Sequence, residues 1–526
     1  MKQFIVFLLT ISLCSTDAYK FLVYSPIYGY SHTNFMGALA DTLTEAGHNV
    51  TILLPIMDEG QQNKTGVKLT TKIIKVPADP RSRAMFGSVD DILSKMWTME
   101  PSIFGLLQMA KNMTTSFVNQ CQNLVNDDEL MKQLADEKFD VGISETVQIC
   151  GLGIFEYLKI PASIGVFSAV HMDCLSAGIG EPIMPSYVPG GMATNGDRMN
   201  FFERFKNLVS VMVGGRFFSS VFVEEIEVFR AKVGPHFKGY EELLADISYA
   251  FTNSNPYIDF PRPMLHKTIP IGGIAVATDS KKNVLSKEWN DILNRRNTTV
   301  LVSFGSMAKS VLMPDKYKKT LLEVFESMPE TTFIWKYEEE SSKVAAHLEN
   351  VHLSTWLPQN ALLADPRLSV FITHGGLGST TELAHMGKPA LLIPLFSDQT
   401  RNAHMLTKHG GGIVLKKDDL ENPQKLRDSL KDILSNVSYA RNAKRLAEML
   451  INQPISAKQL FIKHSEFAAK FGRLPNLDPY GRQLSFFQYF LIDIFLVVIA
   501  ALAVSIYIVV RILRKIYSVR TKSKKD

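Results

Sequence analysis

The chain reads VFITHGGLGSTTE over residues 370–382, with WLPQN over residues 356–360 before it and PLFSDQ over residues 394–399 after it. The first of these segments is an apolar strand followed by a glycine-rich turn and a helix. Backbone N–H groups at such a helix start point outward, and the positive end of the helix dipole favours a phosphate there. Trp356 precedes this turn, and an acid–amide pair, Asp398 and Gln399, follows it. The three segments have the order needed to hold a base, a diphosphate and a sugar.

Each segment also has a simpler interpretation when it is taken alone. The glycines suit any tight turn, and Ser379 with Glu382 matches a capping box, in which two side chains satisfy the first N–H groups of a helix. Trp356 fits a hydrophobic core as well as an exposed position, where stacking on a nucleobase is worth roughly 1 to 3 kcal/mol. Asp398 and Gln399 fit an ordinary turn. The residues by themselves leave these alternatives open.

The whole chain predicts two domains of alternating strands and helices. Its 526 residues exceed what a single core usually accommodates. Apolar strands are expected at residues 21–25, 50–54, 73–76, 141–145 and 249–253, and again at residues 299–304, 332–336, 352–353, 370–373 and 390–395. Helices are expected at residues 35–43, 85–136 and 201–244, with a proline- and glycine-rich loop at residues 182–196. A proline-rich linker at residues 256–270 separates the two series.

Repeated strand–helix units on both sides of a linker predict an α/β fold with two facing doubly wound domains, each with a parallel sheet. Ligands of such sheets bind at the carboxyl ends of the strands. We therefore expect the loops at residues 28–34, 305–306, 374–379 and 397–399 to converge on one cleft.

Both ends of the chain indicate a membrane. Residues 1–18 contain Lys2, an apolar core and small residues before Ala18, as in a signal peptide; a first buried strand is the alternative, but a better strand follows. Residues 488–510 form the predicted transmembrane helix, because residues 490–510 are long and apolar enough to cross a bilayer, although a buried core helix has a similar composition. The basic tail, residues 511–526, favours an anchor whose tail is cytosolic and whose preceding chain lies on the other side.

Composition narrows the function further. The net charge of +5 resides in the last sixteen residues, which hold seven Lys or Arg and one Asp, so it indicates a membrane surface and no nucleic-acid partner.

Cys121, Cys150 and Cys174 follow the signal peptide and permit one disulfide and one free thiol. No His or Cys cluster has metal-ligand spacing, so we expect no metal. Five N-x-S/T triplets fit a glycoprotein, at Asn49, Asn63, Asn112, Asn297 and Asn436.

The ordered set of motifs resembles the signature of the membrane-bound UDP-glycosyltransferases of family 1, which include UDP-glucuronosyl- and UDP-glucosyltransferases. The motifs are WLPQN at 356–360, FITHGG at 371–376, Glu382, GKP at 387–389 and PLFSDQ at 394–399. The resemblance also includes Ser31-His32, FDV at 139–141, PSYVP at 185–189 and SFGS at 303–306. It implies a GT-B-like fold with an acceptor-binding domain at residues 19–270, a UDP-sugar-binding domain at residues 271–455, and a segment, residues 456–487, that crosses back to the first domain.

The resemblance also implies which residues bind the donor. Trp356 would stack on the uracil, and Gln359 would border the base and ribose. Glu382 would bind the ribose hydroxyls, which favours a ligand-binding interpretation of this side chain over the capping box. The diphosphate would lie against Ser306, His374, Gly376 and Ser379, and the sugar hydroxyls against Asp398 and Gln399.

His32 is the matching candidate for the general base. An imidazole, with an ordinary pKa of about 6.5, suits the removal of a hydroxyl proton near neutral pH. A carboxylate on the other ring nitrogen would fix the tautomer, as in the Ser-His-Asp arrangement. The best-known relatives carry an aspartate there, and the matching position here is Glu145, one methylene longer. Two other departures are Gly378, where the family often has asparagine, and His464, where a tryptophan is common.

The sequence therefore predicts an endoplasmic-reticulum membrane enzyme with a lumenal body. Its reaction would transfer a glucuronosyl or glucosyl group from a UDP-sugar, as co-substrate and without a cofactor, to a hydroxyl of a small lipophilic acceptor, with inversion. Met- and Phe-rich residues 85–117, together with residues 167–189, are expected to line the acceptor pocket. The alternative is a membrane-anchored protein that binds a UDP-sugar or a lipophile without turnover. A lipid or glycoprotein acceptor and homo-oligomer formation stay open.

Overall fold

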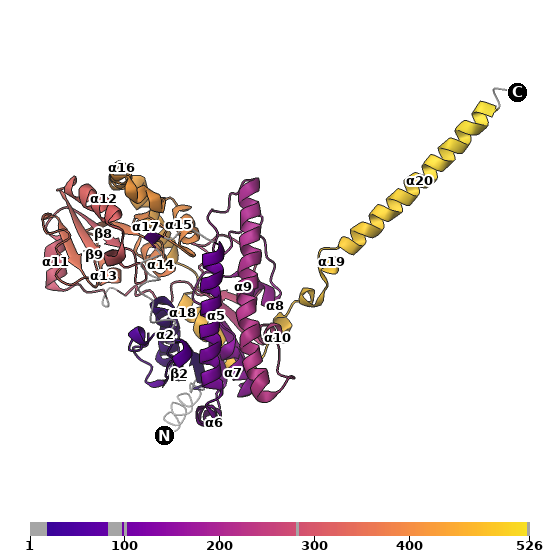
Figure 1. Ribbon diagram of the computed structural model, residues 1–526, viewed down its shortest axis with the longest axis horizontal. Coiled ribbons are helices and arrows are strands. Elements are labelled where there is room, and N and C mark those ends of the chain that lie inside the picture. Colours follow the sequence, from indigo (N-terminus) through magenta and orange to yellow (C-terminus); the bar gives the residue numbers. More distant parts are fainter. Residues whose placement is uncertain (1–17, 83–96, 99–102, 280–282, 523–526) are drawn as a thin grey trace, which may run out of the picture. The chain divides into compact units, whose positions relative to one another are not determined.

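The computed structural model describes residues 18–82, 97–98, 103–279 and 283–522 (Figure 1). The chain divides into a compact unit at residues 1–477 and a second unit at residues 478–526, which are considered separately below. The predicted signal peptide lies outside the described residues except for Ala18, as does much of the Met- and Phe-rich segment between residues 85 and 117.

The first half of residues 1–477 forms a seven-stranded parallel sheet in the order β3-β2-β1-β4-β5-β6-β7. Its strands are β1 Lys20–Tyr24, β2 Asn49–Pro55, β3 Lys72–Val76, β4 Val141–Glu145, β5 Ala162–Phe167, β6 Tyr249–Thr252 and β7 Thr268–Pro270. The helices between them are α2 Tyr30–Glu45, α5 Ile103–Val125, α6 Asp128–Glu137, α7 Cys150–Tyr157, α8 Asp173–Ile179, α9 Phe201–Val233 and α10 Tyr240–Asp246.

The second half forms a six-stranded parallel sheet in the order β10-β9-β8-β11-β12-β13. Its strands are β8 Thr298–Ser303, β9 Thr331–Lys336, β10 Val351–Ser354, β11 Leu368–Thr373, β12 Ala390–Leu392 and β13 Gly412–Val414. Its helices are α11 Lys287–Leu293, α12 Asp315–Glu326, α13 Gln359–Ala364, α14 Leu377–Met386, α15 Gln399–Thr407, α16 Pro423–Ser435 and α17 Val437–Ile451. A further helix, α18 Ala457–Phe471, packs on the first sheet, where His464 lies edge-on to Tyr249 at 4.9 Å between ring centroids.

The central strands of both sheets are buried on both faces, with successive residues pointing to opposite sides. In β1, Leu22 and Tyr24 belong to a core beneath α5, α7 and α9, whereas Phe21 and Val23 belong to the core on the other face. The sequences of these central strands are therefore largely continuous apolar runs rather than alternating ones. Helices α5 and α9 run side by side over the first core (Figure 1).

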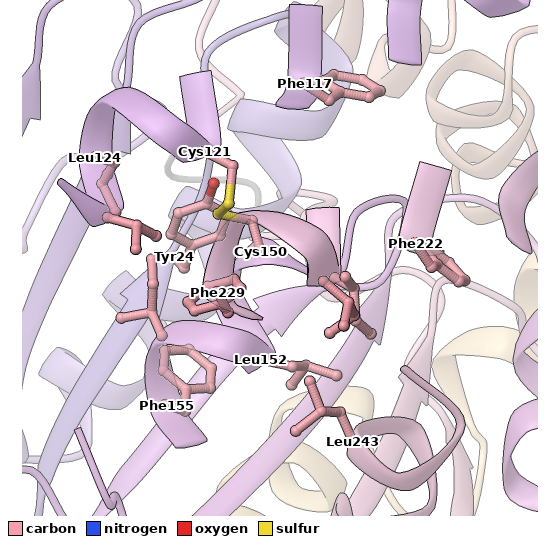
Figure 2. Packing of buried hydrophobic residues seen from close by; sticks show 14 of the residues in the cluster. Tyr24, Phe117, Cys121, Leu124, Cys150, Leu152, Phe155, Phe222, Phe229 and Leu243 are labelled. Carbon is pink, nitrogen blue, oxygen red and sulfur yellow. A yellow bond between two sulfur atoms is a disulfide. The ribbon is translucent and has the colours of Figure 1, made fainter. Parts of the chain in front are cut away.

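A disulfide joins α5 to the start of α7, between Cys121 and Cys150, and leaves Cys174 as a free thiol. Figure 2 shows this bridge within the first core, close to Tyr24 and Leu124. The prediction of one disulfide and one free cysteine is consistent with this arrangement.

Three strands were missing from the sequence-based prediction, one predicted strand is shorter in the structure, and one predicted helix is divided in two. The missing strands are β5, β7 and β13, of which β7 lies within the segment predicted as a linker. The strand predicted at residues 390–395 ends at Leu392, since Pro394 has no N–H to continue the ladder. The helix predicted at residues 201–244 is divided into α9 and α10, because Gly234 and Pro235 interrupt it.

The unit at residues 478–526 contains α19 Phe486–Tyr489 and α20 Ile492–Lys522. Residues 492–518 of α20 are long and apolar enough to cross a membrane, and none of the most apolar stretch is buried by protein. The helix continues into the segment predicted as a basic tail. It is therefore a helix with the properties of a membrane anchor.

Candidate active site

His32 and Glu145 lie together at the carboxyl edge of the first sheet. The strands β1 and β4 are neighbours, so the loop after Tyr24 and the end of β4 meet at this edge. His32 occupies the first turn of α2, and its Nδ1 lies 2.7 Å from Oε1 of Glu145. Glu145 is 3% exposed and His32 is 28% exposed. The pair predicted from the sequence is thus in contact, with the carboxylate inside and the imidazole facing outward.

Electrostatics favour the charged forms of both groups. Burial opposes an imidazolium, but the charge of Glu145 and its hydrogen bond outweigh burial, so the pKa of His32 is raised from 6.5, with a further contribution from Asp398. Burial likewise opposes a carboxylate at Glu145, but His32, Ser168 and Tyr28 outweigh it and lower the pKa of this carboxyl. The extra methylene of glutamate therefore leaves the base–carboxylate contact intact.

Two hydroxyl groups that sequence reasoning missed complete this cluster. Tyr28 donates from Oη to Oε2 of Glu145 at 2.9 Å, and Ser168 donates from Oγ to Oε1. Both hydroxyl oxygens also lie 2.7 Å from Nδ1 of His32. Tyr28 lies between the predicted strand β1 and the helix α2, so its position after a strand end was an available signal. Ser168 directly follows β5, which the sequence analysis did not predict, so no such signal pointed to it.

His374 directly follows β11 and is buried between two glycines of the second sheet's carboxyl edge. A Cβ at Gly305 would stand 2.6 Å from Cε1 of His374, and one at Gly376 would stand 2.7 Å from its Nε2. The ring therefore requires glycine on both sides. Burial, with a smaller effect of Lys336, lowers the pKa of His374 to about 4, so the imidazole is neutral and acts as a hydrogen-bonding group without charge.

The predicted phosphate-binding turn begins α14 without a side-chain cap. Gly376 is the N-cap residue, and Ser379 lies within the helix, so the capping box considered for Ser379 and Glu382 is wrong. Glu382 accepts a hydrogen bond from Nε2 of Gln359 at 2.6 Å, and the same amide donates to Ser379 at 3.1 Å. Burial raises the pKa of the Glu382 carboxyl. Three of the predicted donor-site side chains thus contact one another.

Trp356 is an exposed aromatic ring, so a core position is excluded. The side chain is 57% exposed and lies edge-on to Tyr30 from the first half of the chain, at 6.1 Å between centroids. The ammonium group of Lys336 stands 6.0 Å from its centroid and donates to the carbonyl oxygen of Gly305 at 2.9 Å. Lys336, at the end of β9, is a buried cation beside this site that the sequence analysis missed.

The remaining predicted residues lie on the loops after β8 and β12. Ser306 is exposed beside Gly305. Asp398 accepts from Nδ2 of Asn402 at 2.8 Å, and burial raises the pKa of its carboxyl. Gln399 is buried, and its Oε1 accepts the N–H groups of Leu395 and Phe396, so this oxygen supports the loop. Asp398 also influences the charge of His32, which places this loop near the His32–Glu145 pair.

Among the residues that the structure describes, one group of His, Cys, Asp and Glu side chains is close enough to hold a metal ion. It consists of Cys121, Cys150 and Glu225. Both sulfur atoms are joined in the disulfide and are not metal-binding thiolates.

The sequence is similar to known proteins over most of its length. The family model described as "UDP-glucoronosyl and UDP-glucosyl transferase" matches residues 20–526. The protein ugt-55 of Caenorhabditis elegans is 31% identical over 84% of this chain and 85% of its own length. UDP-glucuronosyltransferase 1A7 of Mus musculus is 27% identical over 91% of this chain and 88% of its own length.

Solved structures share the fold at low sequence identity. The glycosyltransferase of kitacinnamycin has a TM-score of 0.58 at 14% identity, over 86% of this chain and 99% of its own. Phytolacca americana UGT2, solved with UDP-2-fluoro-glucose and pterostilbene, has a TM-score of 0.56 at 13% identity, over 86% of this chain and 100% of its own. The likeness confirms the expected GT-B arrangement of two parallel Rossmann-like sheets.

Proposed function

Because the chain belongs to the family of UDP-glucuronosyl and UDP-glucosyl transferases, we propose that it transfers glucuronate or glucose from a UDP-sugar to a hydroxyl of a small lipophilic acceptor. The observation that carries this proposal is the contact of 2.7 Å between His32 and the buried carboxylate of Glu145. A protein that only bound a UDP-sugar would have no need of a carboxylate-supported base at the strand ends.

In the proposed reaction, Nε2 of His32 removes the hydroxyl proton of the acceptor while the acceptor oxygen bonds to the anomeric carbon. The bond between that carbon and the oxygen of the β-phosphate breaks, and UDP leaves with the electron pair. Attack from the side opposite the leaving group inverts the anomeric configuration. Glu145 then stabilises the imidazolium, which is the function of the carboxylate in a catalytic triad.

The donor is proposed to bind along the second sheet. The exposed ring of Trp356 offers a stacking face for uracil, and Glu382 offers a carboxylate for the ribose hydroxyls. The amides at the start of α14 and the neutral His374 would hold the diphosphate by hydrogen bonds. Such preorganised donors stabilise the charge that develops on the leaving UDP.

The sugar and the acceptor are proposed to meet between Asp398 and His32. Gln399 would join Asp398 in binding the sugar hydroxyls, through its amide nitrogen. Phe117 of α5 packs edge-on against Tyr28 at 5.4 Å between centroids, which places an apolar ring next to a side chain that contacts the proposed base. Residues 85–96 and 99–102 of the proposed acceptor pocket lie outside the described residues.

The membrane location is proposed from the two chain ends. The helix α20 would anchor the enzyme once in the endoplasmic-reticulum membrane, with its basic end in the cytosol and the body in the lumen. A lumenal location agrees with the disulfide, because such bridges persist in an oxidising compartment.

UDP release tests the proposed function. Full-length protein is incubated with UDP-glucose or UDP-glucuronate and a model phenol, and the release of UDP is compared between wild type, His32→Ala and a control variant, His347→Ala. His347 is exposed and belongs to a turn before β10. Loss of a general base is expected to lower kcat by a factor of about 10² to 10⁴. Equal UDP release from wild type and His32→Ala would show that the proposal is wrong.

A further inference from the structure

The carboxylate of Glu145 is held from both neighbouring strands of the sheet. Its strand β4 lies between β1 and β5, and Tyr28 follows β1 while Ser168 follows β5. Oε2 accepts the hydroxyl of Tyr28 at 2.9 Å. Oε1 accepts the hydroxyl of Ser168 and, at 3.3 Å, its backbone N–H. Oε2 is therefore held from the side of β1, and Oε1 is held from the side of β5.

These contacts also determine the position of the protons. The two hydroxyl oxygens lie 2.7 Å from Nδ1 of His32, so either hydroxyl has a choice between Nδ1 and Glu145 as its acceptor. An ionised carboxylate is the stronger acceptor, and it can accept several hydrogen bonds at once. When both hydroxyl groups donate their hydrogen bonds to Glu145, Nδ1 of His32 keeps its own proton and donates a hydrogen bond to Oε1. The lone pair of the imidazole is then on Nε2.

We propose that Tyr28 and Ser168 are positioning residues that adapt the site to a glutamate. This inference rests on the proposed function of His32 as the base. A glutamate has one more rotatable bond than an aspartate, and an unrestrained carboxylate would not hold the imidazole in one orientation. The two hydroxyl groups remove this freedom by binding one carboxylate oxygen each. They therefore act on the reaction through Glu145.

The charges around His32 predict the effect of removing the hydroxyls on the pH profile. Among the residues that the structure describes, the titratable groups that face the imidazole are Glu145 on β4, Tyr28 before α2 and Asp398 before α15. Burial, and then the charge of Glu145, raise the pKa of Tyr28 well above its ordinary range, so this hydroxyl stays a donor. Both hydroxyl dipoles point positive ends toward the carboxylate and offset part of its charge. Without the two hydroxyl groups, more of the negative charge of Glu145 would stabilise the imidazolium, and the pKa of His32 would rise.

The test compares Tyr28→Phe, Ser168→Ala and the double variant in the full-length enzyme. Matched controls are Tyr439→Phe, which removes a hydroxyl that donates to the exposed Asp432, and Ser219→Ala on the exposed side of α9. We expect kcat to fall about tenfold in each of the two site variants, because the base loses its orientation. The KM for the UDP-sugar and the affinity for UDP are expected to stay unchanged. The acid limb of kcat/KM should move to higher pH.

Two further variants separate positioning from general damage. Ser168→Thr retains a hydroxyl and should restore most of the lost kcat. Glu145→Asp shortens the side chain away from Tyr28, so Tyr28→Phe should lower kcat less in that background than in wild type.

The inference is wrong if Tyr28→Phe and Ser168→Ala keep the wild-type kcat and pH profile while His32→Ala is inactive. It is also wrong if UDP affinity falls as much as kcat, because the effect would then be structural. An active His32→Ala enzyme would instead refute the proposed function itself.

Discussion

Glu225 of α9 provides a test of how the segment after Glu145 is held. Its carboxyl is fully buried, and Oε2 accepts the backbone N–H groups of Ile149 at 2.6 Å and Cys150 at 3.2 Å. These residues begin α7, directly after the turn that follows Glu145. Burial raises the pKa of Glu225 from 4.5 to about 8, although the two N–H groups oppose the shift. The folded protein therefore keeps this carboxyl protonated at neutral pH.

The sign of the pH dependence follows from this raised pKa. Below pH 4.5 the carboxyl is protonated in both the folded and the unfolded protein, and its contribution to stability is fully present. Between pH 4.5 and about 8, the unfolded protein releases the proton and the folded protein retains it. The free energy of unfolding then falls by about 1.4 kcal/mol for each pH unit. Over the whole interval the loss is at most roughly 5 kcal/mol.

Glu225→Gln removes the titration and keeps a carbonyl oxygen for the same two N–H groups. We expect the variant to be no more stable than wild type near about pH 5 and more stable near about pH 8, since only wild type loses stability between them. Thermal unfolding followed by intrinsic fluorescence at several pH values measures the difference in Tm. Glu224→Gln, at the exposed neighbouring position, is the matched control. A difference in Tm between Glu225→Gln and wild type that stays constant over this range would refute the reasoning.

Three substitutions on the donor side give further predictions. Gly305→Ala would put a Cβ 2.6 Å from His374 at a φ of +87° and should lower UDP affinity about tenfold. A Cβ added at Gly378 would have no heavy atom within 4 Å, so the UDP affinity of Gly378→Ala should stay within about twofold of wild type. A similar loss of UDP affinity in Gly305→Ala and Gly378→Ala would contradict the steric argument. Trp356→Ala should weaken UDP binding by roughly 1 to 3 kcal/mol in calorimetry, without a change in Tm, and unchanged binding would exclude stacking.

The sequence predicted the strands that have strong local signals. The apolar runs of β1, β2, β8 and β11 extend over five to seven residues and are followed by turn or helix signals. The strands β5, β7 and β13 were missed because their assignment depends on a neighbouring strand to complete the ladder. For β7 and β13, three residues each, local composition carries little information about such pairing.

Some residues of the candidate site were likewise predicted from the sequence, and others were found only in the structure. Motif order pointed to Trp356, Gln359 and Glu382, and the structure shows that Gln359 contacts Glu382 while Trp356 is exposed. Local pattern was misleading for the capping box, since the helix begins two residues before Ser379. Tyr28 and Ser168 belong to no recognisable motif. Their contact with Glu145 is apparent only in the structure, where the ends of β1, β4 and β5 adjoin.

The sequence alone determined the family, the α/β class and the presence of an apolar C-terminal helix, because motif order, strand–helix alternation and hydropathy are properties of the chain itself. Tertiary structure decided that His32 and Glu145 are 2.7 Å apart although 113 positions separate them. It also decided that His374 is neutral and that Glu225 keeps its proton. The physical reason is that contact distance and burial depend on which strand ends adjoin in the sheet, and both set the pKa values and orientation of the reactive groups.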